Sequence, residues 1–188
     1  MFITITNMLN ESHWYAAKTK HQTEKKIKSR LAEMDIECFV PFHTLVVERN
    51  GKKIKQEKPL VPNLVFIYTD RQTALSLPND TGIDIIYMRD LTTRQLLIIP
   101  DKQMEDFMFL HNFSPNAIRV MNTNLKKGDR VKVIKGEFSG IEGELIRIQG
   151  HKRVVIRLEG LFSLATTYIP KEFLELIDIS NQDYITHC

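Results

Sequence analysis

The stretch GDRVKVIKGEFSGIEGEL, residues 128–145, decides the fold of the C-terminal part of this chain. Valines alternate with charged residues along its first half, a pattern typical of a strand that buries one face. Glycines then recur at short intervals, as expected where tight loops join strands. The positions that carry the pattern are Gly128, Asp129, Val131, Val133, Gly136, Phe138, Gly140 and Gly143. We expect Phe138 to fill one end of a small β-barrel of about five strands.

The residues that follow support the same barrel. Three further β-rich segments are separated by glycines or polar turns: Glu144–Ile148, Arg153–Leu158 and Thr166–Ile169. Their β-branched side chains favour strands over helices, so we predict a barrel as the resting state of residues 126–178. We expect residues 179–188 to form a C-terminal tail. Upstream, residues 113–125 are rich in Asn, Ser, Pro and Thr without periodicity, which is typical of a linker between independently packed units.

Residues 1–112 alternate between strand and helix patterns. Strands are expected at Trp14–Lys18, Ile36–Val40, Leu64–Tyr68, Ile83–Tyr87 and Leu96–Ile99. A helix is expected over Gln22–Met34, with Ile27, Leu31 and Met34 turned inward. The whole chain is therefore predicted to be α+β: an antiparallel sheet flanked by helices, joined by a linker to a small barrel.

Turn and cap signals refine this N-terminal half. Asn50-Gly51 favours a type I′ hairpin between Thr44–Glu48 and Lys52–Lys58. Asp70 is expected to cap a short helix that Pro78 stops. A last helix over Asp101–Asn112 places four side chains on one face: Met104, Phe107, Met108 and His111.

Composition excludes several classes of protein. An apolar share of 43% suffices for packed cores, and a net charge of +3 is far from that of a polybasic protein. No basic leader with an apolar run begins the chain and no window reaches the ~18 apolar residues of a membrane span, so we expect a cytoplasmic protein and no membrane partner. Cys38 and Cys188 are too few for a disulfide framework or a CxxC metal site.

No enzymatic machinery is visible in the sequence. The motifs GxxxxGK[ST], HExxH and GxSxG are absent, and the six histidines have no ligand spacing. We therefore expect no catalytic residues, no metal and no cofactor. His111 is interpreted as a partly buried helix residue and Cys38 as small core packing.

A basic run marks the first helix. Between Lys18 and Glu33 six cations face two carboxylates, for a net charge of +4. Because Ile27 and Leu31 point inward, the lysines at positions 25, 26 and 28 must face outward. The surface is either a nucleic-acid contact or an ordinary solvated helix face.

The barrel stretch resembles the KOW motif at all its glycine and apolar positions. The N-terminal half resembles the NGN domain of NusG and its paralogue RfaH. The resemblance rests on Trp14-Tyr15, Cys38-Phe39-Val40-Pro41, the Asn50-Gly51 hairpin and Pro59-Leu60-Val61-Pro62-Asn63-Leu64-Val65-Phe66-Ile67, which fall in one order. Residues 59–66 resemble the RfaH branch and the UpxY-type antiterminators of capsule polysaccharide loci more closely than the housekeeping factor.

The resemblance implies an elongation or antitermination factor that binds RNA polymerase as a monomer. An apolar patch of the NGN domain would dock on the clamp helices of the polymerase; its residues by position are Val61, Pro62, Leu64, Phe66, Met104 and Phe107. A core role for Phe66 and Phe107 stays open, whereas Val61 and Leu64, at the strand entrance, are expected to be exposed.

The resemblance also implies contacts with nucleic acid and a second partner. Lys20, His21, Lys25 and Lys26 would touch non-template DNA. Thr81 stands where some relatives carry a basic residue. The KOW domain would recruit Rho or a small-subunit ribosomal protein. Two alternatives remain: a KOW-type RNA-binding protein of the ribosome, and a housekeeping NusG that assists Rho termination.

Overall fold

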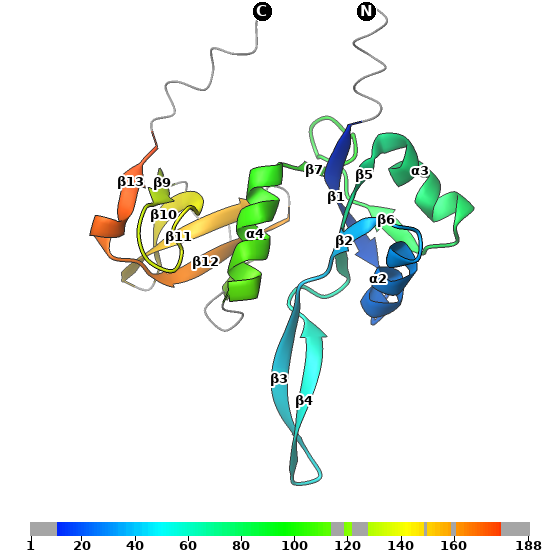
Figure 1. Cartoon of the computed structure of the whole chain (residues 1–188), viewed down its shortest axis with the longest axis horizontal. Helices are drawn as coiled ribbons and strands as arrows, with labels where there is room; N and C mark the ends of the chain where they lie inside the picture. The colour runs from blue at the N-terminus through cyan, green and yellow to red at the C-terminus, as the bar shows by residue number, and fades with distance from the viewer. Residues whose placement is uncertain (1–10, 114–118, 122–127, 149, 159–160, 178–188) are drawn as a thin grey trace, which may run out of the picture. The chain divides into compact units, whose positions relative to one another are not determined.

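The computed structural model describes residues 11–113, 119–121, 128–148, 150–158 and 161–177 (Figure 1). It divides into two compact units, Met1–Met104 and Glu105–Cys188. Most of the predicted linker, the predicted tail 179–188 and Cys188 lie outside the described residues, and the predicted boundaries at residues 112, 125 and 178 stay predictions. Within the described residues, no helix is long and apolar enough to cross a membrane.

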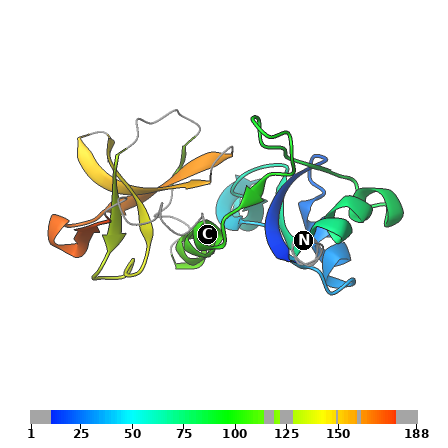
Figure 2. The ribbon, with the colours of Figure 1, turned by 90° about the horizontal axis from the view of Figure 1, so that it is seen from above.

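The first unit is built on an antiparallel sheet in the order β2-β5-β1-β6, with β7 also paired to β1. The strands are β1 (Ser12–Thr19), β2 (Glu37–Phe39), β5 (Leu64–Asp70), β6 (Ile85–Tyr87) and β7 (Ile98–Ile99). Helices α2 (Glu24–Ala32) and α3 (Arg71–Asp80) pack on the same side of this sheet (Figure 2). Their contacts are apolar: Ile27, Leu31 and Leu77 meet Val65 and Ile67 of β5.

Because side chains alternate along a strand, Leu64 and Phe66 of β5 lie on the opposite face of the sheet. Trp14 and Tyr68, which pair across β1 and β5, stack there with ring centroids 5.2 Å apart. Phe39 of β2 approaches Phe66 on the same face, at 6.5 Å between ring centroids. The sheet is therefore apolar on both faces.

A long hairpin projects from this unit as a separate two-stranded sheet (Figure 1). Its strands are β3 (Phe42–Arg49) and β4 (Lys52–Pro59), paired in register from Phe42–Pro59 to Arg49–Lys52. Asn50 and Gly51 have φ of 53° and 73°. Two successive left-handed residues are what a type I′ turn requires, which confirms the predicted hairpin.

Two predictions for the helices are wrong. Pro78 does not stop α3, which continues to Asp80. Proline there removes only one donor near the helix end, and the Thr81 hydroxyl donates to the carbonyl of Leu77 at 2.6 Å. Met34 is 37% exposed rather than turned inward, because α2 ends at Ala32.

The second unit is a six-stranded antiparallel sheet in the order β13-β9-β10-β11-β12-β8. Its strands are β8 (Arg119–Met121), β9 (Asp129–Val133), β10 (Glu142–Ile148), β11 (His151–Leu158), β12 (Phe162–Tyr168) and β13 (Leu174–Leu176), with a 3-10 turn at Lys171–Phe173. The strand rather than helix state predicted for these segments is confirmed. β8 arises within the predicted linker and adds a strand by pairing with β12. Helix α4 (Asp101–Phe113) joins the two units in sequence.

The glycines of the barrel stretch have two different roles. Gly136 and Gly140 have φ of 83° and 97°, so they supply the predicted left-handed loop conformations. Gly128 and Gly143 instead allow close approach of neighbouring strands: a Cβ on Gly143 would lie 2.7 Å from the carbonyl oxygen of Val155. Phe138 is 5% exposed, which agrees with its predicted packing role.

Candidate functional site

The turn between β4 and β5 is tied to helix α2 by a buried carboxylate. Glu24 is only 4% exposed, and its Oε1 accepts a hydrogen bond from the backbone N of Asn63 at 2.8 Å. The carbonyl oxygen of Asn63 accepts from the backbone N of Thr19 at 3.1 Å. Asn63 itself has φ of 60°, a left-handed conformation that asparagine tolerates. In the sequence, Glu24 is one of the two carboxylates that oppose the basic run, and its position near the start of the predicted helix was the available signal.

The residues predicted to bind polymerase differ in accessibility. Val61 is half-buried and Pro62 is exposed, at the turn that Glu24 holds. Leu64, Phe66 and Met104 are 5%, 0% and 0% exposed. The expected exposure of Leu64 is therefore wrong: it belongs to β5, which is flanked on both edges by β1 and β2 and is buried on both faces.

Phe107 is fully buried within the second unit. Its ring lies edge-on to Phe162 of β12, with centroids 5.7 Å apart. One residue earlier, the buried Asp106 accepts a hydrogen bond on Oδ2 from the backbone N of Glu142 at 3.3 Å. This part of α4 is therefore fastened to the sheet of the second unit by one aromatic and one polar contact.

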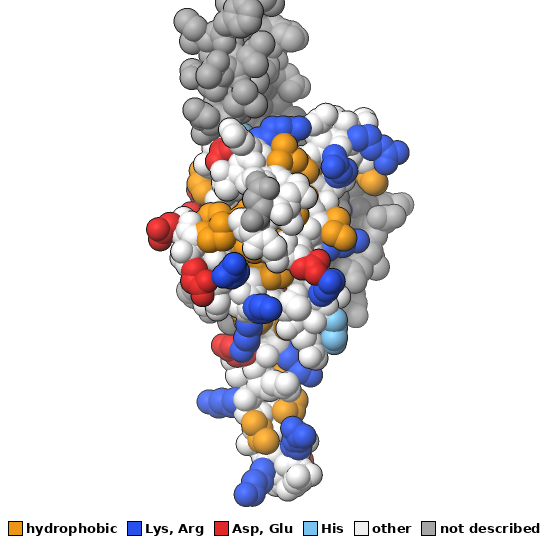
Figure 3. Space-filling model, turned by 90° about the vertical axis from the view of Figure 1, so that its right-hand side faces the viewer, with side chains coloured by type: hydrophobic (Ala, Val, Ile, Leu, Met, Phe, Trp, Pro, Cys, Tyr) orange, Lys and Arg blue, Asp and Glu red, His pale blue; other side chains and the backbone are white. Residues whose placement is uncertain are grey.

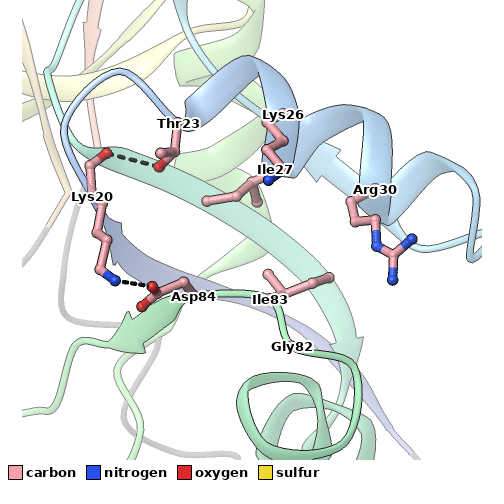
Figure 4. Close-up of a pocket in the computed structure, with 8 residues that line it drawn as sticks. All are labelled: Lys20, Thr23, Lys26, Ile27, Arg30, Gly82, Ile83 and Asp84. Atoms are coloured by element: carbon pink, nitrogen blue, oxygen red, sulfur yellow. Dashed lines mark hydrogen bonds and ion pairs between the residues drawn. The ribbon is translucent and has the colours of Figure 1, made fainter.

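A hollow of about 560 Å³ opens between the start of α2 and the loop before β6 (Figure 4). Lys20, Lys26 and Arg30 bring three cations to it, and Ile27 and Ile83 supply apolar lining. Lys20 forms an ion pair with Asp84, which anchors one wall. The rim thus carries three cations and the carboxylate of Asp84, a net charge of +2 above an apolar floor, which suits an anionic ligand.

The four residues predicted to bind nucleic acid are not all brought together. Lys20 and Lys26 line the hollow, and His21 is exposed in the preceding turn. Lys25 points elsewhere: its Nζ lies 2.7 Å from Glu57 Oε2 and 5.4 Å from the centroid of the Phe42 ring, at the base of the hairpin. The hydrogen bond from Lys25 lowers the pKa of the Glu57 carboxyl.

Two neighbouring residues change the predicted surface. Arg30 belongs to the basic run but was not among the predicted contacts; its place one turn after Lys26 on α2 puts both on the same side. The hydroxyl of Thr81 donates a hydrogen bond to the carbonyl oxygen of Leu77 at the end of α3.

In the described part of the chain, no group of His, Cys, Asp and Glu residues is placed to hold a metal ion. Cys38 is half-buried against the core, and burial raises the pKa of its thiol. His111 is 9% exposed and packs edge-on against Phe107. Both side chains have the packing positions expected of them.

Comparison with known proteins matches residues 12–108 to the family model described as "Transcription termination factor nusG". The "Transcription termination/antitermination protein NusG" of Streptococcus pyogenes is 27% identical over 153 residues, which cover 74% of this chain and 82% of that protein. A solved structure of Thermotoga maritima NusG aligns with 89% of this chain and 98% of that one, at 16% identity and a TM-score of 0.46. Over 35 residues, 19% of this chain, the sequence is 54% identical to the large ribosomal subunit protein uL24 of Xylella fastidiosa, of which the match covers 33%.

Proposed function

The chain belongs to the NusG family of transcription termination and antitermination factors, and on that premise we propose that it binds RNA polymerase through its first unit and suppresses pausing or termination. Proteins of this family are transcription factors and not enzymes. The observation that carries the proposal is that the family match, residues 12–108, spans the two-faced apolar sheet and the turn pinned beside it.

The proposed docking surface centres on Val61 and Pro62. Val61 is half-buried and Pro62 is exposed, and both lie in the turn that leads into β5, the strand that bears Leu64 and Phe66. A few apolar anchors with a polar surround are enough to dominate the affinity of such a contact. The buried members of the predicted patch, Leu64, Phe66, Met104 and Phe107, take part only if binding exposes them.

The test is binding to purified RNA polymerase, followed by transcription of a long template that contains pause sites. Val61→Glu places a charge in the proposed contact and is expected to weaken binding at least tenfold, the cost of about 1.4 kcal/mol, and to restore pausing. Leu91→Glu is the matched control, because Leu91 is 81% exposed in a turn outside the surface. Leu64→Glu is unsuitable, since it would bury a charge in β5. Unchanged polymerase binding by Val61→Glu would remove Val61 from the contact, and wild-type protein that neither binds polymerase nor alters pausing would end the proposal.

We further propose that the hollow on α2 holds single-stranded non-template DNA. Lys26 offers its charge to a phosphate directly, whereas Lys20 and Arg30 do so by exchanging their ion pairs with Asp84 and Glu33 for a phosphate. The apolar lining of Ile27 and Ile83 accommodates a base. His21 follows Lys20 in the turn before α2 and is exposed, so on this proposal it contacts the same DNA strand. Lys25 contributes least, because it does not line the hollow and its ammonium group is held by Glu57 at the base of the hairpin. Double substitution Lys26→Gln and Arg30→Gln is expected to reduce single-strand binding and its salt dependence, measured by fluorescence anisotropy.

The second unit is proposed to recruit a partner, either Rho or a small-subunit ribosomal protein. On this proposal the factor acts in the cytoplasm on specific long operons, such as polysaccharide biosynthesis loci, in the manner of the RfaH and UpxY-type paralogues. Chromatin occupancy mapping separates this from a housekeeping factor: a specialised paralogue occupies few operons, and a general factor follows polymerase almost everywhere.

One observation favours a second candidate function. The local 54% identity to a ribosomal protein is compatible with an RNA-binding, ribosome-associated role. A pull-down from cell extract distinguishes the two, because ribosomal particles without polymerase would be recovered under the second function and polymerase subunits under the first.

A further inference from the structure

The hairpin β3–β4 carries a concentration of positive charge that the proposed polymerase and single-strand contacts do not use. Over residues 42–59 five cations face two carboxylates, Glu48 and Glu57, which gives +3, as much as the formal charge of the whole chain. The cations are Arg49, Lys52, Lys53, Lys55 and Lys58. All of them are exposed. In Figure 3, Lys and Arg side chains lie along the narrow projection at the bottom of the view.

The pairing register sorts the hairpin into two unlike faces. Cross-strand partners share a face, and faces alternate along the ribbon. One face, here named the basic face, consists of the pairs His43–Lys58, Leu45–Gln56, Val47–Ile54 and Arg49–Lys52. It contains no carboxylate. Both acidic residues belong to the other face, which consists of Phe42–Pro59, Thr44–Glu57, Val46–Lys55 and Glu48–Lys53.

The contacts at the base of the hairpin show which face is free. Glu57 and Phe42, both on the acidic-containing face, are engaged by Lys25 of α2. The basic face therefore points away from α2. Among the described residues, Arg49, Lys52 and Lys58 have no ion-pair partner, and Leu45 and Ile54 between them are 38% and 46% exposed.

We propose that the basic face of the β3–β4 hairpin binds the major groove of double-stranded DNA. The major groove of B-DNA admits a two-stranded β-ribbon, and cations along such a ribbon reach the phosphates on either side. Leu45, Val47 and Ile54 fit this setting as small apolar contacts with sugars and thymine methyl groups. The Asn50-Gly51 turn leaves the tip slender enough to enter.

The same observations disfavour other occupants. Single-stranded nucleic acid is held by aromatic stacking, and the only aromatic ring on the basic face is that of His43 at the base. The major groove of A-form RNA is too narrow and deep for a ribbon. Protein interfaces are anchored by central Trp, Tyr or Arg side chains, whereas the centre of this face has none of these and consists of Leu45, Val47, Ile54 and Gln56.

The test measures binding of the full chain, without polymerase, to a labelled DNA duplex, an RNA duplex and a DNA single strand by fluorescence anisotropy across a salt series. The hairpin variant combines Arg49→Gln, Lys52→Gln and Lys58→Gln. Two controls match it: Arg49→Lys with Lys52→Arg and Lys58→Arg keeps the charge, and Arg147→Gln with Lys135→Gln and Lys171→Gln removes the same charge from exposed positions of the second unit.

Each lost phosphate contact is expected to make the negative slope of log K against log salt shallower by about 0.9. At 0.1 M salt this corresponds to a roughly eightfold loss of affinity per contact. We expect the hairpin variant to lose at least two contacts on the DNA duplex, roughly 60-fold, while both controls stay near wild type. Equal binding of the hairpin variant and wild type, or equal loss in the Arg147 control, overturns the proposal. A hairpin variant that binds duplex normally but has lost polymerase marks the ribbon as a protein contact and also overturns it, while leaving the proposed polymerase function intact.

Discussion

Replacement of Glu24 by alanine tests whether helix α2 and the β4–β5 turn act as one rigid piece. The carboxylate is 4% exposed and accepts the backbone N–H of Asn63 at 2.8 Å, so truncation leaves that N–H without its acceptor. A hydrogen bond to a charged group contributes about 1.5–3 kcal/mol. Glu24 is also the acidic residue in the first turn of α2, which adds about 0.3–1 kcal/mol through the helix dipole.

We therefore expect Glu24→Ala to destabilise the first unit by about 2 kcal/mol or more, which corresponds to a fall in melting temperature of about 8–16 °C for a domain of this size. Trp14 is the only tryptophan of the chain and is buried in this unit, so its fluorescence reports on this unit's unfolding. Glu24→Gln keeps an oxygen acceptor and is expected to lose about half as much. An Ala variant that melts together with wild type, or a Gln variant as unstable as the Ala variant, would refute the role assigned to this hydrogen bond.

Three further predictions concern other contacts. Gly143→Ala is expected to destabilise the second unit by about 1–3 kcal/mol, because its Cβ would lie 2.7 Å from the Val155 carbonyl, and unfolding followed by far-UV circular dichroism should show this with no change in the Trp14 transition. Phe138→Ala should cost the same unit about 3 kcal/mol in urea denaturation through the cavity it leaves. Asp70→Ala should cost about 1 kcal/mol at pH 7, since Asp70 caps α3 through the backbone N of Thr73 at 3.0 Å. The hydrogen bond that the Thr73 hydroxyl donates to Asp70 Oδ2 at 2.6 Å, together with the bond from the Thr73 backbone N, holds the pKa of Asp70 below its ordinary 3.8. The stabilisation by Asp70 is therefore present above pH 3.8 and is lost as the pH falls through the lowered pKa. A wild type and variant whose stabilities differ equally at pH 7 and at pH 2 would contradict this.

Local patterns predicted most of the elements because their signals lie within a few residues. Asn50-Gly51 specified its hairpin turn, and the alternating valines of the barrel stretch specified β9. Contacts between residues far apart in the sequence could not be predicted from such local signals. Leu64 looked exposed from its place after Pro62, but it is the first residue of β5, a central strand whose side chains are buried on both faces of the sheet.

For the candidate surfaces too, local patterns predicted which side chains face outward but not which partners they contact. Outward-facing lysines on α2 followed from helical periodicity, yet periodicity does not say that Lys25 turns to the hairpin while Lys26 turns to the hollow. A buried Glu24 is likewise invisible in a list of charges, because its partner is a backbone N–H 39 residues away.

The register of the β3–β4 ribbon limits how its length can vary. A single residue added to or deleted from one strand exchanges the inward and outward sets beyond that point, and would bring Glu48 onto the side now occupied by Arg49. Only changes in matched pairs, one residue on each strand beside the turn, lengthen or shorten the arm while keeping its two sides chemically distinct.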